Sequence, residues 1–247
     1  MLASVARQST PPREIIIADD GSGTATLAVI ESFVRAHPAP VRVVRQPHEG
    51  FRVARLRNLA IAAATCDYLV FIDGDMLLHP EFMGDHARFA RRGYFTQGIR
   101  AHADARLTAR LIEGSAEFPT ASTPGLGGLR RAYLLHSAPL SGLMRHAANA
   151  FVALKACNLG AWREDLLRVN GFDEDMVGWG PEDKELCARL GHAGVRRQTL
   201  LFGGIASHLH HPSESRSGLP QNLALLDKTR RDKLTRCDRG LDAHFPK

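Results

Sequence analysis

The stretch "YLVFIDGD", residues 68–75, decides the fold, because five largely apolar positions lead directly into two aspartates separated by one glycine. A short apolar run of this kind, here following a helical run at 53–64, is typical of a buried strand. Two carboxylates at the end of such a strand are costly to desolvate unless a cation or hydrogen-bond donors offset them. Asp and Gly are also common in turns, so the stretch alone leaves a solvated turn open.

The preceding residues repeat the same alternation of short apolar runs and helical runs. We expect strands at 14–18 and 41–45, and a helix at 24–36. This order predicts an α/β fold with a mostly parallel sheet flanked by helices. Ligands bind beyond the carboxyl ends of the strands in such sheets. The pairs Asp19-Asp20 and Asp73-Gly74-Asp75 both follow strands, so we expect both on the ligand-binding edge.

The second half of the chain is less regular. Residues 107–145 contain the segment "PTASTPGLGGLRRA", which is rich in Gly, Pro, Ser and Thr. This composition predicts a long excursion that becomes ordered only when substrate binds. Regular signals return with helices expected at 181–190 and 221–236.

Length and charge restrict the classes of protein. The chain has 247 residues, a net charge of +6 and a pI near 9.5, which suit one large α/β domain with an anionic partner. Nucleic acid is disfavoured, because the sequence has neither an RNA-recognition aromatic pattern nor helix-turn-helix spacing. The four cysteines are scattered without a CxxC motif, as in a cytosolic protein with reduced thiols. We therefore expect a cytoplasmic protein whose basic surface can rest on the acidic inner face of the membrane.

The pair Asp73 and Asp75 suggests two chemistries. Carboxylate oxygens suit Mg²⁺ or Mn²⁺, and such a cation would stabilise a departing diphosphate. Alternatively, Asp73 could be the nucleophile of a haloacid-dehalogenase-type phosphatase. Those sites usually continue with Gly and then Thr or Ser, whereas Met76 and Leu77 follow here, which disfavours this alternative.

Two further segments carry functional side chains. In "GWGPEDKELCARL", residues 178–190, Glu182 and Asp183 could simply complement a helix dipole, but this does not explain the Gly-Trp-Gly before them. Trp179 between small residues suits stacking on a sugar ring, with Asp183 as a general base and Glu182 on a neighbouring hydroxyl. In "SHLHHP", residues 207–212, His208 follows an apolar segment and is the histidine best placed to be buried. Imidazole can join carboxylate in binding manganese.

The order of these segments along the chain resembles family 2, GT-A-fold inverting glycosyltransferases of bacterial type. The resemblance covers nearly the whole chain and is carried by "PPREIIIADDGSG", "GFRVARLRNLAIAAATCDYLVFIDGDM", "CNLGAWREDLLRVNGFDEDMVGWGPEDKEL" and "SHLHHP". The C-terminal part is also similar to the galactosyltransferase region with a Gly-Trp-Gly-x-Glu-Asp motif. The family implies a GT-A fold, a UDP-sugar donor, a saccharide or lipid-linked saccharide acceptor and a Mn²⁺ or Mg²⁺ cofactor. It also implies a nucleotide-sugar-binding half at 1–106 and an acceptor-binding and catalytic half at 107–247.

The resemblance further implies a role for each matching residue. Asp19 would form a hydrogen bond to the uracil, and Arg52 would contact the same base. Asp73 would lie at the ribose and the metal-bound region. Asp75 and His208 would bind the metal. His211 is a weaker candidate ligand, and the sequence does not decide among His208, His210 and His211. Trp179 and Glu182 would contact the acceptor, and Asp183 would be the catalytic base.

Two departures from the family pattern accompany the resemblance. The family usually opens with a strand that ends in a Thr-Tyr-Asn-type turn, whereas this chain starts with the helical run "LASVARQ". We therefore expect the first strand of the fold to be missing. Some relatives also have a third acidic residue where Lys184 stands, which weakens the transfer of acceptor identity. An inactive nucleotide- or carbohydrate-binding module derived from this fold is the alternative to an enzyme.

Overall fold

The computed structural model describes residues 1–114, 117–127, 129–150, 152–212 and 218–245. Its contacts divide the chain into two compact units. Unit 1 comprises Met1–Pro11, Val70–Ala161 and Arg197–Ser213. Unit 2 comprises Pro12–Leu69, Trp162–Arg196 and Glu214–Lys247.

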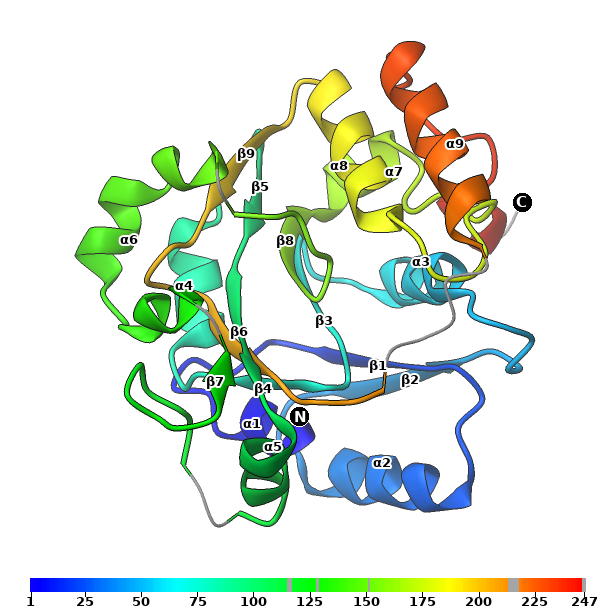
Figure 1. The fold of residues 1–247 in the computed structure, drawn as a ribbon. Coiled ribbons are helices and arrows are strands. Elements are labelled where there is room, and N and C mark those ends of the chain that lie inside the picture. The colour runs from blue at the N-terminus through cyan, green and yellow to red at the C-terminus, as the bar shows by residue number, and fades with distance from the viewer. Residues whose placement is uncertain (115–116, 128, 151, 213–217, 246–247) are drawn as a thin grey trace. The chain divides into compact units, whose positions relative to one another are not determined.

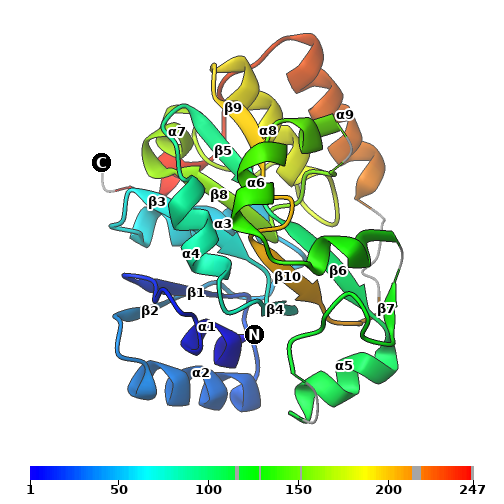
Figure 2. The same ribbon diagram turned by 90° about the vertical axis from the view of Figure 1, so that its left-hand side faces the viewer.

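Unit 2 is built on a parallel pair of strands. β1 (Ile15–Asp19) pairs with β2 (Val41–Arg45) along its whole length, so that both strands end at the same edge. The helices α2 (Thr24–Ala36) and α3 (Val53–Ala63) lie on opposite faces of this pair (Figures 1 and 2). The remaining described elements of unit 2 are α7 (Arg163–Arg168), α8 (Glu182–His192), α9 (Leu219–Arg231) and η3 (Leu241–His244).

The structure also contains two four-stranded sheets. The first lies in unit 1 and carries the histidine segment, whereas the second has residues in both units. The first sheet has the order β4-β10-β6-β7, with β4 at Met76–Leu78, β10 at Ile205–His208, β6 at Ile99–Ala103 and β7 at Leu126–Gly127. β10 runs antiparallel to β4 and parallel to β6. The second sheet has the order β3-β8-β5-β9, with the strands at Tyr68–Ile72, Asn158–Trp162, Tyr94–Gln97 and Arg196–Thr199.

Helical elements complete unit 1. They are α1 (Leu2–Ala6), α4 (Phe82–Phe89), α5 (Ala105–Ile112), η1 (Leu129–Leu134), α6 (Ala138–Met144) and η2 (Ala147–Ala150).

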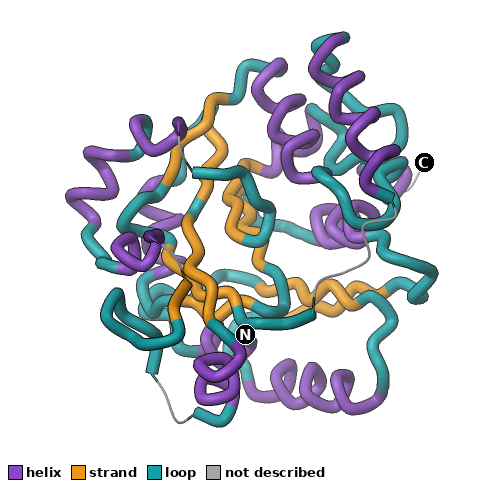
Figure 3. Tube along the Cα trace, viewed as in Figure 1, coloured by secondary structure: helices purple, strands orange, loops and turns teal. Residues whose placement is uncertain are grey.

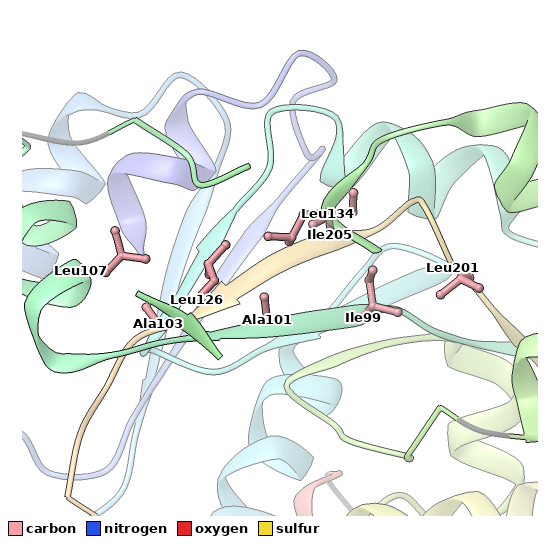
Figure 4. Packing of buried hydrophobic residues seen from close by; sticks show 8 residues of the cluster. All are labelled: Ile99, Ala101, Ala103, Leu107, Leu126, Leu134, Leu201 and Ile205. Carbon is pink, nitrogen blue, oxygen red and sulfur yellow. The ribbon is translucent and has the colours of Figure 1, made fainter. Parts of the chain in front are cut away.

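Strand β6 separates an apolar face from a polar face. Its residues Ile99, Ala101 and Ala103 are buried in one cluster with five residues from other segments (Figure 4), namely Leu107, Leu126, Leu134, Leu201 and Ile205. Because side chains alternate along a strand, Arg100 and His102 project from the opposite face. The same strand therefore supplies both buried apolar and polar side chains.

The fold confirms the α/β class with helices flanking the sheets. The elements expected at 24–36, 41–45 and 68–72 have those bounds in the structure. Neighbouring strands of the sheets include both parallel and antiparallel pairs. α1 is followed by β1, so the described chain has the expected helix before its first strand.

Residues 107–145, expected as a long excursion, contain regular elements where the structure describes them. Figure 3 shows helical and strand segments in this range, and they include most of α5, as well as β7, η1 and α6. Leu107, Leu126 and Leu134 of these elements join the buried cluster on β6. Apolar burial therefore holds the described parts of this segment on the β6 cluster.

Candidate active site

Asp75, His208 and His211 form a cluster in unit 1. The Nε2 atom of His208 lies 3.1 Å from the Oδ2 atom of Asp75, and that of His211 lies 3.0 Å from the same oxygen. One ligand atom from each of the three residues lies within 4.8 Å of the others. The structure thus brings together Asp75 and His208, the two metal ligands expected from the sequence, and the weaker candidate His211.

The strand pairing explains this arrangement. Met76 lies opposite His208 in the antiparallel pair of β4 and β10, and the amide of Leu209 donates a hydrogen bond of 2.9 Å to the carbonyl of Asp75. β10 ends at His208, so strand alternation does not continue to the next histidines. The His210 amide donates instead to Oγ1 of Thr108.

The cluster fits a divalent cation. The Oδ1 atom of Asp75 is buried and has no hydrogen-bond partner among the described residues. A buried carboxylate oxygen without a donor is costly, and a cation would satisfy it. One carboxylate and two imidazoles make a mixed oxygen and nitrogen set, which suits Mn²⁺ better than the all-oxygen preference of Mg²⁺.

Neighbouring positive charges set the ionisation of Asp75. Burial alone would raise the pKa of its carboxyl group. The hydrogen bond from His208 and the charges of His208, His211 and Arg100 outweigh burial, so the pKa of Asp75 is lowered. The carboxylate is therefore kept ionised, which is the form that binds a metal.

Two residues that the sequence did not single out also belong to this region. His102 lies opposite His208 in the parallel register of β6 and β10, and the two rings are 5.0 Å apart. Arg100, two residues earlier on the same face of β6, donates to Sγ of Cys157 at 3.0 Å. Their polar positions between the buried residues of an alternating "IRAHA" strand were the signal that could have identified them.

A second group of polar residues lies at the carboxyl ends of β1 and β2 in unit 2. Asp19 has a side chain that is only 2% exposed, and its carboxylate accepts from the Ser22 amide and pairs with Arg45 at 2.9 Å. Gln46 connects the neighbouring segments, because its Nε2 atom donates to Asp20 at 2.6 Å and to the carbonyl of Arg52 at 3.3 Å. The Gln46 amide also donates to the Asp19 carbonyl at 3.1 Å, so Gln46 links Asp19 to Arg52. Gln46 was not expected from the sequence, although it directly follows β2.

Glycine is required in the turn after β1. Gly21 has φ +73°, and a Cβ atom there would lie 2.6 Å from the amide nitrogen of His48. Only glycine adopts this conformation without strain and permits such a close approach. The "ADDGS" turn therefore fits closely against the segment after β2.

The Gly-Trp-Gly segment is held against α9. The Nδ2 atom of Asn222 donates to the carbonyl of Val177 at 3.0 Å and lies within hydrogen-bond distance of those of Gly178 and Trp179. A Cβ atom on Gly180 would lie 2.4 Å from the same Nδ2 atom. Small residues around Trp179 therefore permit the segment to pack on α9, and Trp179 itself is half-buried.

Glu182 and Asp183 open α8, and they have different surroundings. Glu182 pairs with Nη1 of Arg57 at 2.9 Å, whereas Oδ1 of Asp183 accepts from the Lys184 amide at 2.7 Å. Burial raises the pKa of Glu182, Arg57 opposes this and Asp183 adds to it, so that the pKa of Glu182 lies above its ordinary value. Arg57 thus pairs with the carboxylate that is expected to contact the acceptor, whereas the carboxylate of Asp183 is held by the amide of Lys184.

Comparison with known proteins identifies the family. Residues 1–142 match the family model described as glycosyl transferase family 2, which is more than half of the chain. The chain belongs to glycosyl transferase family 2. Residues 146–212 of this family 2 chain match a second model, described as the N-terminal domain of galactosyltransferase. These matches confirm both parts of the resemblance, and they favour glycosyl transfer over the phosphatase alternative.

Curated relatives of the family 2 chain are longer proteins. It is 27% identical over 235 residues to chondroitin synthase of Pasteurella multocida, covering 86% of this chain and 23% of the relative. It is 28% identical over 207 residues to validoxylamine A glucosyltransferase of Streptomyces hygroscopicus subsp. limoneus, covering 78% and 45% of the two chains. The chain thus spans less than half of the length of either relative.

Solved structures show the same fold. The crystal structure of S. aureus TarS 1–349 matches with a TM-score of 0.61 and 14% identity, covering 99% of this chain and 63% of that one. GalNAc-T7 with UDP, GalNAc and Mn²⁺ matches with a TM-score of 0.59 and 13% identity, covering 87% and 41%. The GT-A fold expected from the sequence is therefore confirmed for this family 2 chain.

Proposed function

We propose that the chain is a metal-dependent inverting glycosyltransferase of the hexosyltransferase type. It moves a sugar from a UDP-sugar to a saccharide or lipid-linked saccharide acceptor, in the synthesis of a surface polysaccharide or lipopolysaccharide. The observation that carries the proposal is the Asp75, His208 and His211 cluster with its unpartnered carboxylate oxygen, in a chain of this family. The names of two relatives, chondroitin synthase and hyaluronan synthase, and the UDP and Mn²⁺ bound to GalNAc-T7 support the donor, metal and polymer.

Unit 1 would provide the electrostatics of the leaving group. Asp75, His208 and His211 would hold Mn²⁺ or Mg²⁺, which when bound supplies positive charge to a diphosphate. Arg100 adds positive charge to the same region, since its charge already lowers the pKa of Asp75. Asp73 precedes the metal ligand by two residues, and we assign it to the ribose side of the nucleotide. Cationic groups that are fixed before the reaction stabilise departing charge without reorganisation.

Unit 2 would bind the base of the nucleotide at the carboxyl ends of β1 and β2. We assign Asp19 and Arg52 to the uracil, with Gln46 as the residue that positions Arg52 through its carbonyl. The Nε atom of Arg52 is buried and has no hydrogen-bond partner among the described residues. The Nη1 atom of Arg52 pairs with Glu49 and the Nη2 atom donates to the Pro47 carbonyl, so the assignment of Arg52 to the base rests on the family resemblance.

Unit 2 would also provide the acceptor chemistry. Asp183 removes the proton from the acceptor hydroxyl, whose oxygen attacks the anomeric carbon as the bond to UDP breaks. Trp179 stacks on the apolar face of the acceptor sugar, and Glu182, oriented by Arg57, accepts from a neighbouring hydroxyl. In-line attack of this kind inverts the anomeric configuration.

The test compares Asp183→Asn with the wild type. The amide keeps an oxygen that can accept from the Lys184 amide, so the helix start is preserved. Transfer from UDP-sugars to a panel of saccharides should fall by roughly 10²- to 10⁴-fold, the usual contribution of a general base. Calorimetry with UDP and Mn²⁺ should show unchanged affinity. Wild-type turnover in this variant would disprove the role of Asp183, and wild-type protein that binds UDP without any transfer or donor hydrolysis would indicate the binding module instead.

A further inference from the structure

The helix α6 in unit 1 exposes an apolar face that nothing in the proposed reaction uses. Leu140 and Leu143 are 40% and 78% exposed, and they lie three residues apart, so they share one side of the helix. Pro139 is also exposed beside them. Leu135, which precedes the helix, is 59% exposed. We call Leu135, Pro139, Leu140 and Leu143 the α6 surface.

The opposite side of α6 is fixed to the core of unit 1. Ser141 is fully buried, and Met144 packs against the cluster on β6. A Cβ atom on Gly142 would lie 3.6 Å from the ring of Phe89 at the end of α4, so the two helices are in contact. The α6 surface therefore faces outward because the other side of the helix is packed.

Basic residues outnumber acidic residues in the sequence around this surface. Residues 118–163 contain no Asp or Glu, but they contain four arginines and one lysine. Arg131 is exposed, and Arg145 is half-buried at the C-cap of α6. Residues 86–103, which include the end of α4 that contacts α6, also lack acidic residues and contain Arg88, Arg91, Arg92 and Arg100. Asp85 of α4 is buried and pairs with His136, so the exposed charged residues of these two ranges are arginines.

We propose that the α6 surface docks the chain on an anionic lipid bilayer. Leu140 and Leu143 enter the boundary between headgroups and acyl chains, and Arg131 and Arg145 bind lipid phosphates. Short apolar faces framed by arginine bind membranes in this way, by apolar burial together with attraction to acidic lipids. None of the helices in the described ranges is both long and apolar enough to cross a bilayer, so such a contact would lie on the membrane surface.

A second copy of the chain fits the same surface less well. A symmetric dimer through α6 would place the same surface of each copy against the other. The cationic side chains of one copy, Arg131 and Arg145, would then lie against the cationic side chains of the other copy. Like charges across an interface oppose association. An anionic bilayer complements both the leucines and the arginines.

The test is sedimentation of the whole chain with vesicles of phosphatidylcholine alone or with about one third phosphatidylglycerol. We expect binding only to the acidic vesicles, and weaker binding at high salt. The double variant Leu140→Ser/Leu143→Ser should reduce the partition coefficient about tenfold or more, because the apolar burial is lost. Arg131→Gln and Arg145→Gln should each reduce it roughly fivefold.

A matched control is Val29→Ser on α2. Val29 is 60% exposed, and its helix carries Glu31 and Arg35, whose side chains pair at 3.8 Å and offset each other. This variant should bind acidic vesicles like the wild type, and circular dichroism melts should show that all variants are folded. Equal binding to neutral vesicles, unchanged binding of the double variant or a wild-type dimer that the double variant abolishes would each overturn the proposal.

Discussion

Glu14 shows at the scale of one residue how an acidic side chain can stabilise a fold rather than a site. Its carboxylate accepts from the amides of Thr65 and Cys66 at 2.8 and 2.7 Å, and it pairs with Arg42 at 2.5 Å. Burial alone would raise the pKa of Glu14, but the two amides and Arg42 outweigh it and lower the pKa to about 2. The side chain thus joins the start of β1 to β2 and to the segment before β3.

We expect Glu14→Gln to reduce the free energy of unfolding at pH 7 by about 1–2 kcal/mol, because charge-assisted hydrogen bonds are lost. A folded-state pKa that is lower than the unfolded one stabilises the fold above the unfolded pKa. The wild-type advantage should therefore be complete above about pH 5 and disappear as the pH falls towards 2. Urea unfolding of both proteins between pH 3 and 7 measures this. A difference that stays constant over this range would contradict the role of the charge.

The histidines after β10 allow a prediction that the sequence could not make. His211 reaches Asp75, whereas the His210 amide binds Thr108, so His211→Ala should weaken Mn²⁺ binding by at least about tenfold. His210→Ala is the matched control and should leave the affinity nearly unchanged. Calorimetric titration with Mn²⁺ measures both. A larger loss in His210→Ala would exclude His211 as a ligand.

At the scale of elements, the sequence predicted what local periodicity determines. α2, β2 and β3 have the expected bounds, since their apolar residues recur at regular intervals. β4 and β6 were missed, because β4 has only three residues and β6 alternates one isoleucine with alanines around Arg100 and His102. Their strand pairing with β10, more than a hundred residues later, determines them. The same long-range pairing brings His211 to Asp75, which no local pattern indicates.

α3 provides an element-scale test through Asn58. This buried side chain donates to the Phe172 carbonyl and to Glu174, and it accepts from the Phe172 amide, each at 2.8 Å. Asn58→Ala would leave a buried amide and a buried carbonyl unsatisfied, so we expect a loss of about 2–4 kcal/mol in unfolding free energy. Gln221→Ala, at an exposed position of α9, is the control and should change it by less than about 0.5 kcal/mol. Urea unfolding gives both values, and a similar small loss in Asn58→Ala would show that this connection contributes little.

At the scale of the whole molecule, the metal cluster couples ligand binding to folding. Asp75 and the two histidines are more than 130 positions apart in the sequence, and β4 and β10 bring them together only when unit 1 is folded. The unfolded chain holds no such cluster, so a cation that binds it should stabilise the folded state. The size of that stabilisation depends on the concentration of free metal relative to its Kd.

We therefore expect Mn²⁺ at about a hundred times its Kd to stabilise the wild type by about 2.7 kcal/mol. For a chain of this length, this corresponds to an increase in Tm of roughly 5–10 °C. Asp75→Ala should lose most of the increase, because the only carboxylate of the cluster is removed, and EDTA should reverse the increase in the wild type. Asp183→Asn is the control and should keep the full increase, since Asp183 is not among the residues of the cluster. Differential scanning calorimetry over a range of Mn²⁺ concentrations measures each shift.

An equal increase in Tm for Asp75→Ala would place the stabilising cation elsewhere on the chain. The assignment of the leaving-group metal to this cluster would then fail.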